Sequence, residues 1–92
     1  MKEKEVPLSS EPYKVISPVM GTFYRSSAPD APPLVTPGQK VEAGEVICII
    51  ESMKIFTELR AQKAGIVKAV LLENEEPVMK NQAVMEIEVD GE

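Results

Sequence analysis

The sequence predicts an all-β fold of short antiparallel strands in two similar halves. Apolar residues alternate with polar ones or form short continuous runs in six stretches, and no stretch has the 3.6-residue spacing of an amphipathic helix. Eight prolines and several glycine-containing turns separate these stretches. The expected strands are Tyr13 to Ser17, Thr22 to Arg25, Val46 to Glu51, Ile55 to Ala61, Ile66 to Leu72 and Val84 to Val89.

The length of the chain allows one small domain. Its 92 residues, 43% of them hydrophobic, are enough for a modest core but not for a deep cleft between domains. We expect residues 13–89 to form the domain and residues 1–12 to be a flexible tail or the remnant of a linker. Residues 90–92 are expected to be a short C-terminal tail. Such a domain is suited to presenting a group to other proteins.

Charge and composition exclude several classes of partner. A net charge of -5 provides no basic surface for nucleic acid or an anionic membrane, and no apolar run approaches the length of a membrane span. The first residues, MKEKEVPLSSEP, lack the apolar region of a signal peptide, and one cysteine cannot form an internal disulfide. We therefore expect a cytoplasmic protein without nucleic-acid or membrane partners.

Catalytic and metal-binding side chains are scarce. The chain has no histidine, and its one cysteine, Cys48, lies within an apolar run, where a small buried hydrophobic residue is expected. Glu86 and Glu88 alternate with apolar residues, which is typical of the solvated face of a strand. We therefore predict neither catalytic residues nor a metal site.

An internal repeat organises the domain. The segment SPVMGTFY, residues 17–24, matches AQKAGIVK, residues 61–68, at an offset of 44. Farther along, VEAGEVICIIE, residues 41–51, matches VMKNQAVMEIE, residues 78–88, at an offset of 37. We expect the two halves to pack face to face and bury surface that neither half can bury alone.

The change of offset locates an insertion in the first half only. Seven additional residues must lie between Tyr24 and Val41, in the Pro-rich stretch RSSAPDAPPLVTPGQK. This stretch is either a packed element or a disordered loop, because its prolines make it stiff without requiring it to pack. The repeat also pairs Lys54 with positions 10 and 91, so a two-fold axis would put Lys54 opposite the chain ends.

Met53 and Lys54 occupy the connection between two expected strands. A two-residue hairpin turn favours Gly, Asn or Asp, because both central residues of a type I′ turn have positive φ. The sequence ESMKIF, residues 51–56, has none of these residues at the turn. An ordinary solvated lysine is the simplest interpretation of Lys54, but two unsuited residues at one turn indicate a functional site.

These motifs carry a resemblance to a known family. The stretches GTFYRSSAPDAPPLVTPGQKVEAGEVICIIESMKI and GIVKAVLLENEEPV resemble the biotinyl domain of the biotin carboxyl carrier proteins of acetyl-CoA carboxylase. The most specific parts are Met53-Lys54 and the insertion containing Ala28-Pro29-Asp30, which is similar to the family's thumb, at about residues 25–40. The resemblance covers about residues 13–89.

The resemblance implies a flattened β-barrel or sandwich of two four-stranded antiparallel sheets related by a pseudo-two-fold axis. It implies that a biotin protein ligase attaches biotin to Lys54, with Met53 contributing to recognition by the ligase. The biotin would then carry a carboxyl group from a biotin carboxylase to a carboxyltransferase, which makes malonyl-CoA for fatty acid synthesis. The domain itself would be a carrier without catalytic activity. Ser26 would contact the biotin ring from the thumb.

Two positions depart from the family pattern and leave alternatives open. Ser52 stands where the family usually has alanine, and Ile55 where it usually has methionine or leucine. The alternatives are the biotinyl domain of another biotin-dependent carboxylase or decarboxylase, a lipoyl domain, and an interaction module with an unmodified lysine. Lipoyl domains share the repeat and the lysine, but they typically have Asp before the lysine and lack the thumb.

Overall fold

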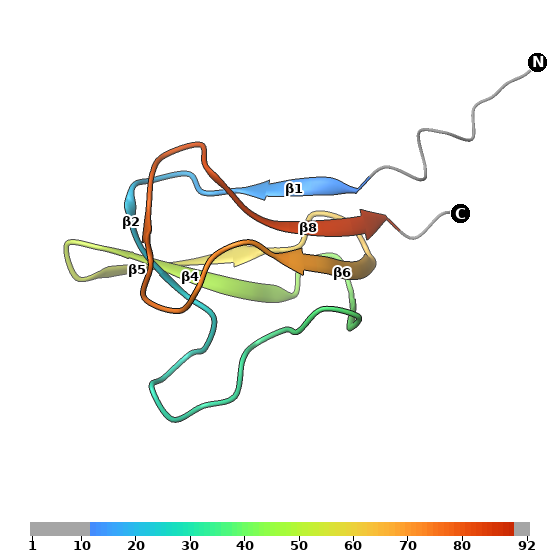
Figure 1. Ribbon diagram of the computed structural model, residues 1–92, viewed down its shortest axis with the longest axis horizontal. Coiled ribbons are helices and arrows are strands. Elements are labelled where there is room, and N and C mark those ends of the chain that lie inside the picture. Colours follow the sequence, from blue (N-terminus) through green and yellow to red (C-terminus); the bar gives the residue numbers. More distant parts are fainter. Residues whose placement is uncertain (1–11, 90–92) are drawn as a thin grey trace, which may run out of the picture.

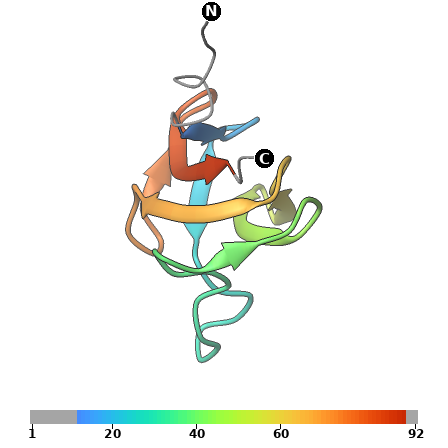
Figure 2. The ribbon, with the colours of Figure 1, turned by 90° about the vertical axis from the view of Figure 1, so that its right-hand side faces the viewer.

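The computed structural model describes residues 12–89, which form two stacked antiparallel sheets of four strands each (Figures 1 and 2). One sheet has the strand order β1-β8-β6-β3 and the other β5-β4-β2-β7. No helix in the described part of the chain is long and apolar enough to cross a membrane. The strands are β1 (Tyr13–Ile16), β2 (Gly21–Tyr24), β3 (Lys40–Val41), β4 (Val46–Ser52), β5 (Ile55–Arg60), β6 (Gly65–Val70), β7 (Pro77–Val78) and β8 (Ala83–Val89).

The strand orders confirm the repeat. When the two strand orders are aligned, β1 stands opposite β5, β8 opposite β4, β6 opposite β2 and β3 opposite β7. Strand β2 therefore corresponds to β6, and β4 to β8. The turns repeat as well, because Gly38 and Glu75 both have positive φ, and so do Gly44 and Asn81. Both pairs are separated by the offset of 37 read from the sequence.

The core lies between the sheets and consists of the inward residues of both halves. Phe23, Ile50, Val67 and Ile87 are fully buried or nearly so. Cys48 is also buried, as predicted, and burial raises the pKa of its thiol to about 12, so the thiol stays protonated and unreactive at neutral pH. The other buried hydrophobic residues are Val15, Val35, Val41, Ile47, Leu59, Ala61, Leu72, Val78, Val84 and Met85.

The predicted fold class is confirmed, with corrections at the level of elements. Six predicted strands are present within one or two residues of their expected ends, but β3 and β7 were not predicted. Each of these has only two residues, too few for an alternating pattern to be visible. The sheets of the described chain are not joined into a closed barrel, so the molecule is a sandwich. Of the predicted tails, residues 1–11 and 90–92 lie outside the described residues.

The connection from β2 to β3 is the largest asymmetry between the halves. It forms a loop that projects from the sandwich (Figure 2), whereas β6 and β7 are joined by the shorter segment 71–76. After the loop, Val35 is buried like Leu72, which lies 37 residues farther along the chain. The repeat is therefore restored at Val35, and residues 27–33 have no counterpart in the second half.

Candidate functional site

The turn between β4 and β5 has the backbone conformation that the sequence predicts. Ser52 pairs with Ile55 at the end of the hairpin, which leaves only Met53 and Lys54 as turn residues. Their φ angles are 52° and 65°, both in the left-handed region. This is the signature of a type I′ turn, in which residues with a Cβ are disfavoured by roughly 1 kcal/mol each.

The side chains at this turn are not used to stabilise the fold. Met53 is 90% exposed, and Lys54 is exposed beside it. Ile55 and Phe56, which begin β5, are 67% and 64% exposed. An exposed lysine on a strained backbone, surrounded by apolar side chains, is a combination that packing does not explain.

The turn also lies where the repeat predicts it. In Figure 1 the tip of the β4–β5 hairpin is at one end of the molecule, and the start of β1 and the end of β8 are toward the other. Lys54 is thus presented away from the points where the chain enters and leaves the domain.

The strained turn leads to a stability prediction. Met53→Asn should raise the free energy of unfolding by about 0.5 to 1 kcal/mol, because asparagine tolerates positive φ and the methionine side chain has no packing to lose. Thermal melts measure the effect, and a less stable variant would contradict the strain argument.

The thumb, residues 25–40, is an ordered loop whose base is closed by backbone hydrogen bonds. Ser26 and Pro33 form an isolated antiparallel bridge, and the Leu34 amide donates to the Arg25 carbonyl oxygen at 2.7 Å. The Arg25 amide in turn donates to Oδ1 of Asn74 at 2.8 Å. The base of the thumb is therefore attached to the loop between β6 and β7.

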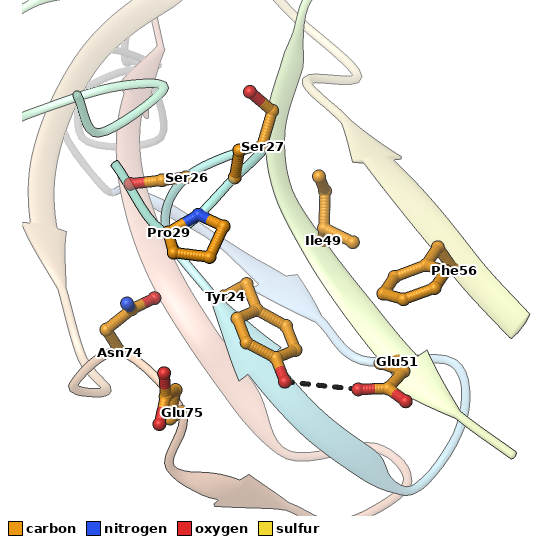
Figure 3. A pocket seen from close by; sticks show the side chains of 10 residues that line it. Tyr24, Ser26, Ser27, Pro29, Ile49, Glu51, Phe56, Asn74 and Glu75 are labelled. Atoms are coloured by element: carbon orange, nitrogen blue, oxygen red, sulfur yellow. Dashed lines mark hydrogen bonds between the residues drawn. The ribbon is translucent and has the colours of Figure 1, made fainter. Parts of the chain in front are cut away.

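A pocket of about 320 Å³ lies between the thumb and the outer face of the sheet that contains β4 and β5 (Figure 3). We call it the thumb pocket. Its floor comes from β2, β4 and β5, and the thumb and the β6–β7 loop form its walls. Ser26, the predicted ring contact, lines it, whereas Met53 and Lys54 do not. The lining residues are Tyr24, Ser26, Ser27, Ala28, Pro29, Ile49, Glu51, Phe56, Asn74 and Glu75.

The thumb pocket is adjacent to the hairpin tip along both strands. Glu51 lies three residues before Lys54 and Phe56 two residues after it, so their backbones are separated from that of Lys54 by about 7 to 10 Å. The extended side chain of an acylated lysine exceeds this distance. A group attached to Lys54 can therefore reach either the pocket or the solvent.

One hydrogen bond crosses the pocket floor. The Tyr24 hydroxyl donates to Oε1 of Glu51 at 3.1 Å, and Figure 3 shows both side chains on the open side of the sheet. The hydrogen bond to Glu51 raises the pKa of Tyr24, with further contributions from burial and from the negative charges of Glu51 and Glu75. The Tyr24 hydroxyl therefore remains a hydrogen-bond donor at neutral pH.

Sequence reasoning did not identify the pocket residues other than Ser26. The repeat contained a signal for them, because Tyr24 and Ile49 correspond to Lys68 and Glu86 in the second half. These charged side chains are expected on a solvated sheet face, and Glu86 and Glu88 do alternate with the buried Met85 and Ile87 there. At the same positions of β2 and β4 the first half has an aromatic and an aliphatic residue, Tyr24 and Ile49. This difference indicates that the outer face of this sheet lines a pocket instead of facing solvent.

The fold and the exposed turn lysine describe the site, and comparison with known proteins identifies the family. The profile of the family described as "Biotin-requiring enzyme" matches residues 13–87. The chain belongs to this family.

Several similar curated proteins are named as biotin carboxyl carrier proteins of acetyl-CoA carboxylase. The chain is 43% identical over 77 residues to the biotin carboxyl carrier protein of acetyl-CoA carboxylase from Nostoc sp., covering 84% of this chain and 42% of that protein. It is 43% identical over 74 residues to the protein of that name from Haemophilus influenzae, covering 80% and 48%. It is 48% identical over 62 residues to the chloroplastic biotin carboxyl carrier protein of acetyl-CoA carboxylase 2 from Arabidopsis thaliana, and the match covers 67% of this chain and 24% of that protein. The chain thus spans about a quarter to a half of these relatives.

Solved structures show the same fold inside larger proteins. The urea carboxylase of Kluyveromyces lactis is 30% identical with a TM-score of 0.70, and the match covers 95% of this chain and 7% of that one. A single-chain, multi-domain long-chain acyl-CoA carboxylase has a TM-score of 0.75 at 16% identity, covering 99% of this chain and 8% of that one. The second similarity is evidence of the fold alone.

Proposed function

We propose that the protein is a biotin carboxyl carrier domain of an acetyl-CoA carboxylase, with biotin attached to Lys54 through an amide. The observation that carries this proposal is the exposed Met53-Lys54 pair on a left-handed two-residue turn, opposite the ends of the domain. Membership of the biotin-requiring family and relatives named as carrier proteins support the same assignment.

The ligase and the domain contribute different parts of the attachment reaction. A lysine amine attacks an activated carboxyl group only when it is deprotonated, and an exposed amine on a hairpin tip provides no base for this step. The ligase must therefore activate biotin and the amine, while the domain supplies an accessible lysine on a rigid support. Once biotin is attached, the tethered ring is confined near both catalytic partners at high effective concentration.

The proposed partners are a biotin protein ligase, a biotin carboxylase and a carboxyltransferase, in the cytoplasm. Acetyl-CoA is favoured over other substrates because the relatives at 43–48% identity are named for acetyl-CoA carboxylase. The direct test uses the biotinylated domain with biotin carboxylase, ATP and radiolabelled bicarbonate, followed by carboxyltransferase and acetyl-CoA. Label should pass to malonyl-CoA, and a domain that takes up no label would contradict the carrier function.

Met53 is proposed to contribute to recognition by the ligase. Met53→Asp should lower kcat/KM for biotinylation about tenfold or more and make the domain a better substrate for a lipoate ligase. The change makes the turn resemble a lipoyl domain, and the 90% exposed side chain is free to contact an enzyme. Parallel assays with the two ligases measure this, and unchanged biotinylation kinetics would remove Met53 from recognition.

The thumb is proposed to serve the carrier function rather than the fold, with Ser26 contacting the biotin ring. Excising Ser27 to Pro33 and joining Ser26 to Leu34 should leave a folded and biotinylated domain, because β6 and β7 are joined without these residues. Transfer of the carboxyl group should fall more than stability. Circular dichroism and the labelled-bicarbonate assay compare the two, and an unfolded product would assign the inserted segment to the core.

A further inference from the structure

The charged residues of the thumb pocket are all negative. Among the described residues that line it, only Glu51 and Glu75 are charged, and both are negative. The remaining polar groups are uncharged, and the apolar surface comes from the thumb and from Ile49 and Phe56. The pocket therefore suits a ring that is partly apolar, carries hydrogen-bond donors and has no negative charge.

Tyr24 lies between the two carboxylates of the pocket in Figure 3. Glu51 accepts the Tyr24 hydroxyl hydrogen bond at 3.1 Å, and Glu75 projects from the wall opposite β4 in Figure 3. The charges of both Glu51 and Glu75 raise the pKa of Tyr24. A ligand that enters between the thumb and Tyr24 is exposed to both negative charges.

The backbone at Glu75 indicates that its side chain is not a requirement of the turn. Glu75 has a φ of 68°, and its counterpart in the first half is Gly38, with a φ of 92°. Glycine adopts this region freely, whereas a residue with a Cβ is disfavoured by roughly 1 kcal/mol. The second half thus places a carboxylate beside the pocket at a position where the fold favours glycine.

We propose that the thumb pocket binds the uncarboxylated biotin ring in preference to the carboxylated ring, with Glu51 and Glu75 as the residues that determine this selectivity. The inference rests on the proposed attachment of biotin to Lys54. The ureido group of biotin has N–H donors that carboxylate oxygens accept strongly. Carboxylation replaces the hydrogen on one ureido nitrogen with a carboxylate, so a donor is lost and a negative charge is gained.

A preference for the uncarboxylated ring would release the ring from the pocket after carboxylation and return it after transfer of the carboxyl group. An uncarboxylated ring rests in the pocket, and the carboxylated ring is repelled by Glu51 and Glu75 and moves into solvent on its arm. The carboxylated ring is then available to the carboxyltransferase. After the carboxyl group has been transferred, the ring loses its charge and binds in the pocket again.

The test compares four forms of one domain by the backbone amide chemical shifts of Ser26, Ser27 and Ala28. The forms carry unmodified Lys54, biotin, biotin kept carboxylated by biotin carboxylase with ATP and bicarbonate, and N-methoxycarbonyl biotin. The last is uncharged but has similar bulk. The thumb amides should shift on biotinylation, return to their unmodified positions on carboxylation, and stay shifted with the methoxycarbonyl ring.

Variants test the two carboxylates directly. Glu51→Gln and Glu75→Gln should each strengthen binding of the carboxylated ring in the pocket about fivefold, which corresponds to about 1 kcal/mol for unit charges about 4 Å apart in water. Glu75→Gly, which installs the residue of the first half, should act like Glu75→Gln. The matched control is Glu88→Gln, which removes one charge from the equivalent position on the other sheet and should change nothing.

The outcomes separate this inference from the proposed function. A wild-type domain that the ligase does not biotinylate at Lys54 would overturn both. A biotinylated domain whose thumb amides do not shift, or whose charged and uncharged rings bind in the pocket equally, would overturn the selectivity and leave the carrier function intact. Loss of the methoxycarbonyl ring from the pocket would show that bulk or the lost N–H donor decides, and would also overturn the role of charge.

Discussion

Lys54→Arg should abolish biotinylation of the domain and leave its fold and stability nearly unchanged. Arginine keeps the positive charge and a long side chain, but its delocalised guanidinium does not form the amide that a lysine amine forms. Lys54 is exposed, so the substitution removes no packing. Intact mass after incubation with biotin ligase, biotin and ATP measures the effect, and thermal melts show that the variant is folded.

Lys80→Arg is the matched control, because Lys80 is exposed in the turn between β7 and β8. Its counterpart in the first half, Ala43, lies in a turn of the same kind. This variant should accept biotin at the wild-type rate. Labelling of the Lys54→Arg protein to any substantial extent would mean that another of the eight lysines is the acceptor.

Gly21→Ala and Gly65→Ala should each lower the free energy of unfolding by about 2 to 3 kcal/mol. A Cβ at Gly21 would overlap the Glu51 carbonyl oxygen and approach Cγ2 of Ile50 at 3.1 Å. A Cβ at Gly65 would meet Glu88 and Ile87 in the same way, at 3.0 Å from Cγ2 of the isoleucine. Backbone must move in both variants, and denaturant unfolding measures the resulting loss.

Gly44→Asn provides the control for these two variants. Gly44 has a φ of 90° and no atom within 4 Å of a built Cβ, and its counterpart Asn81 has a φ of 70°. The asparagine should therefore cost less than about 1 kcal/mol. Equal losses for all three variants would mean that glycine is needed for backbone freedom at Gly21 and Gly65, rather than for the close approach of the neighbouring strand.

The parts of the fold that follow from local pattern could be predicted from the sequence. Alternation predicts β5 and β8, and the two offsets pair β2 with β6 and β4 with β8. The positive φ angles at Met53 and Lys54 followed from the spacing of two strands around a turn of two residues. Each of these predictions depends on neighbours in the chain or on a repeat of it.

The missed features depend on contacts between distant segments. Strands β3 and β7 are strands only because they pair with β6 and β2. The thumb pocket brings together residues from β2, the thumb, β4, β5 and the β6–β7 loop, which no local pattern connects. Its partial signal, Tyr24 and Ile49 at positions where the second half has Lys68 and Glu86, becomes informative only when the repeat is compared face by face.

Biotin attachment at Lys54 is tested most directly by peptide mapping by mass spectrometry of the domain after co-expression with both a biotin ligase and a lipoate ligase. We expect one biotinyl group per chain, on the peptide that contains Lys54, and no lipoyl group. A lipoyl group on Lys54, biotin on a different lysine, or an unmodified chain would contradict it.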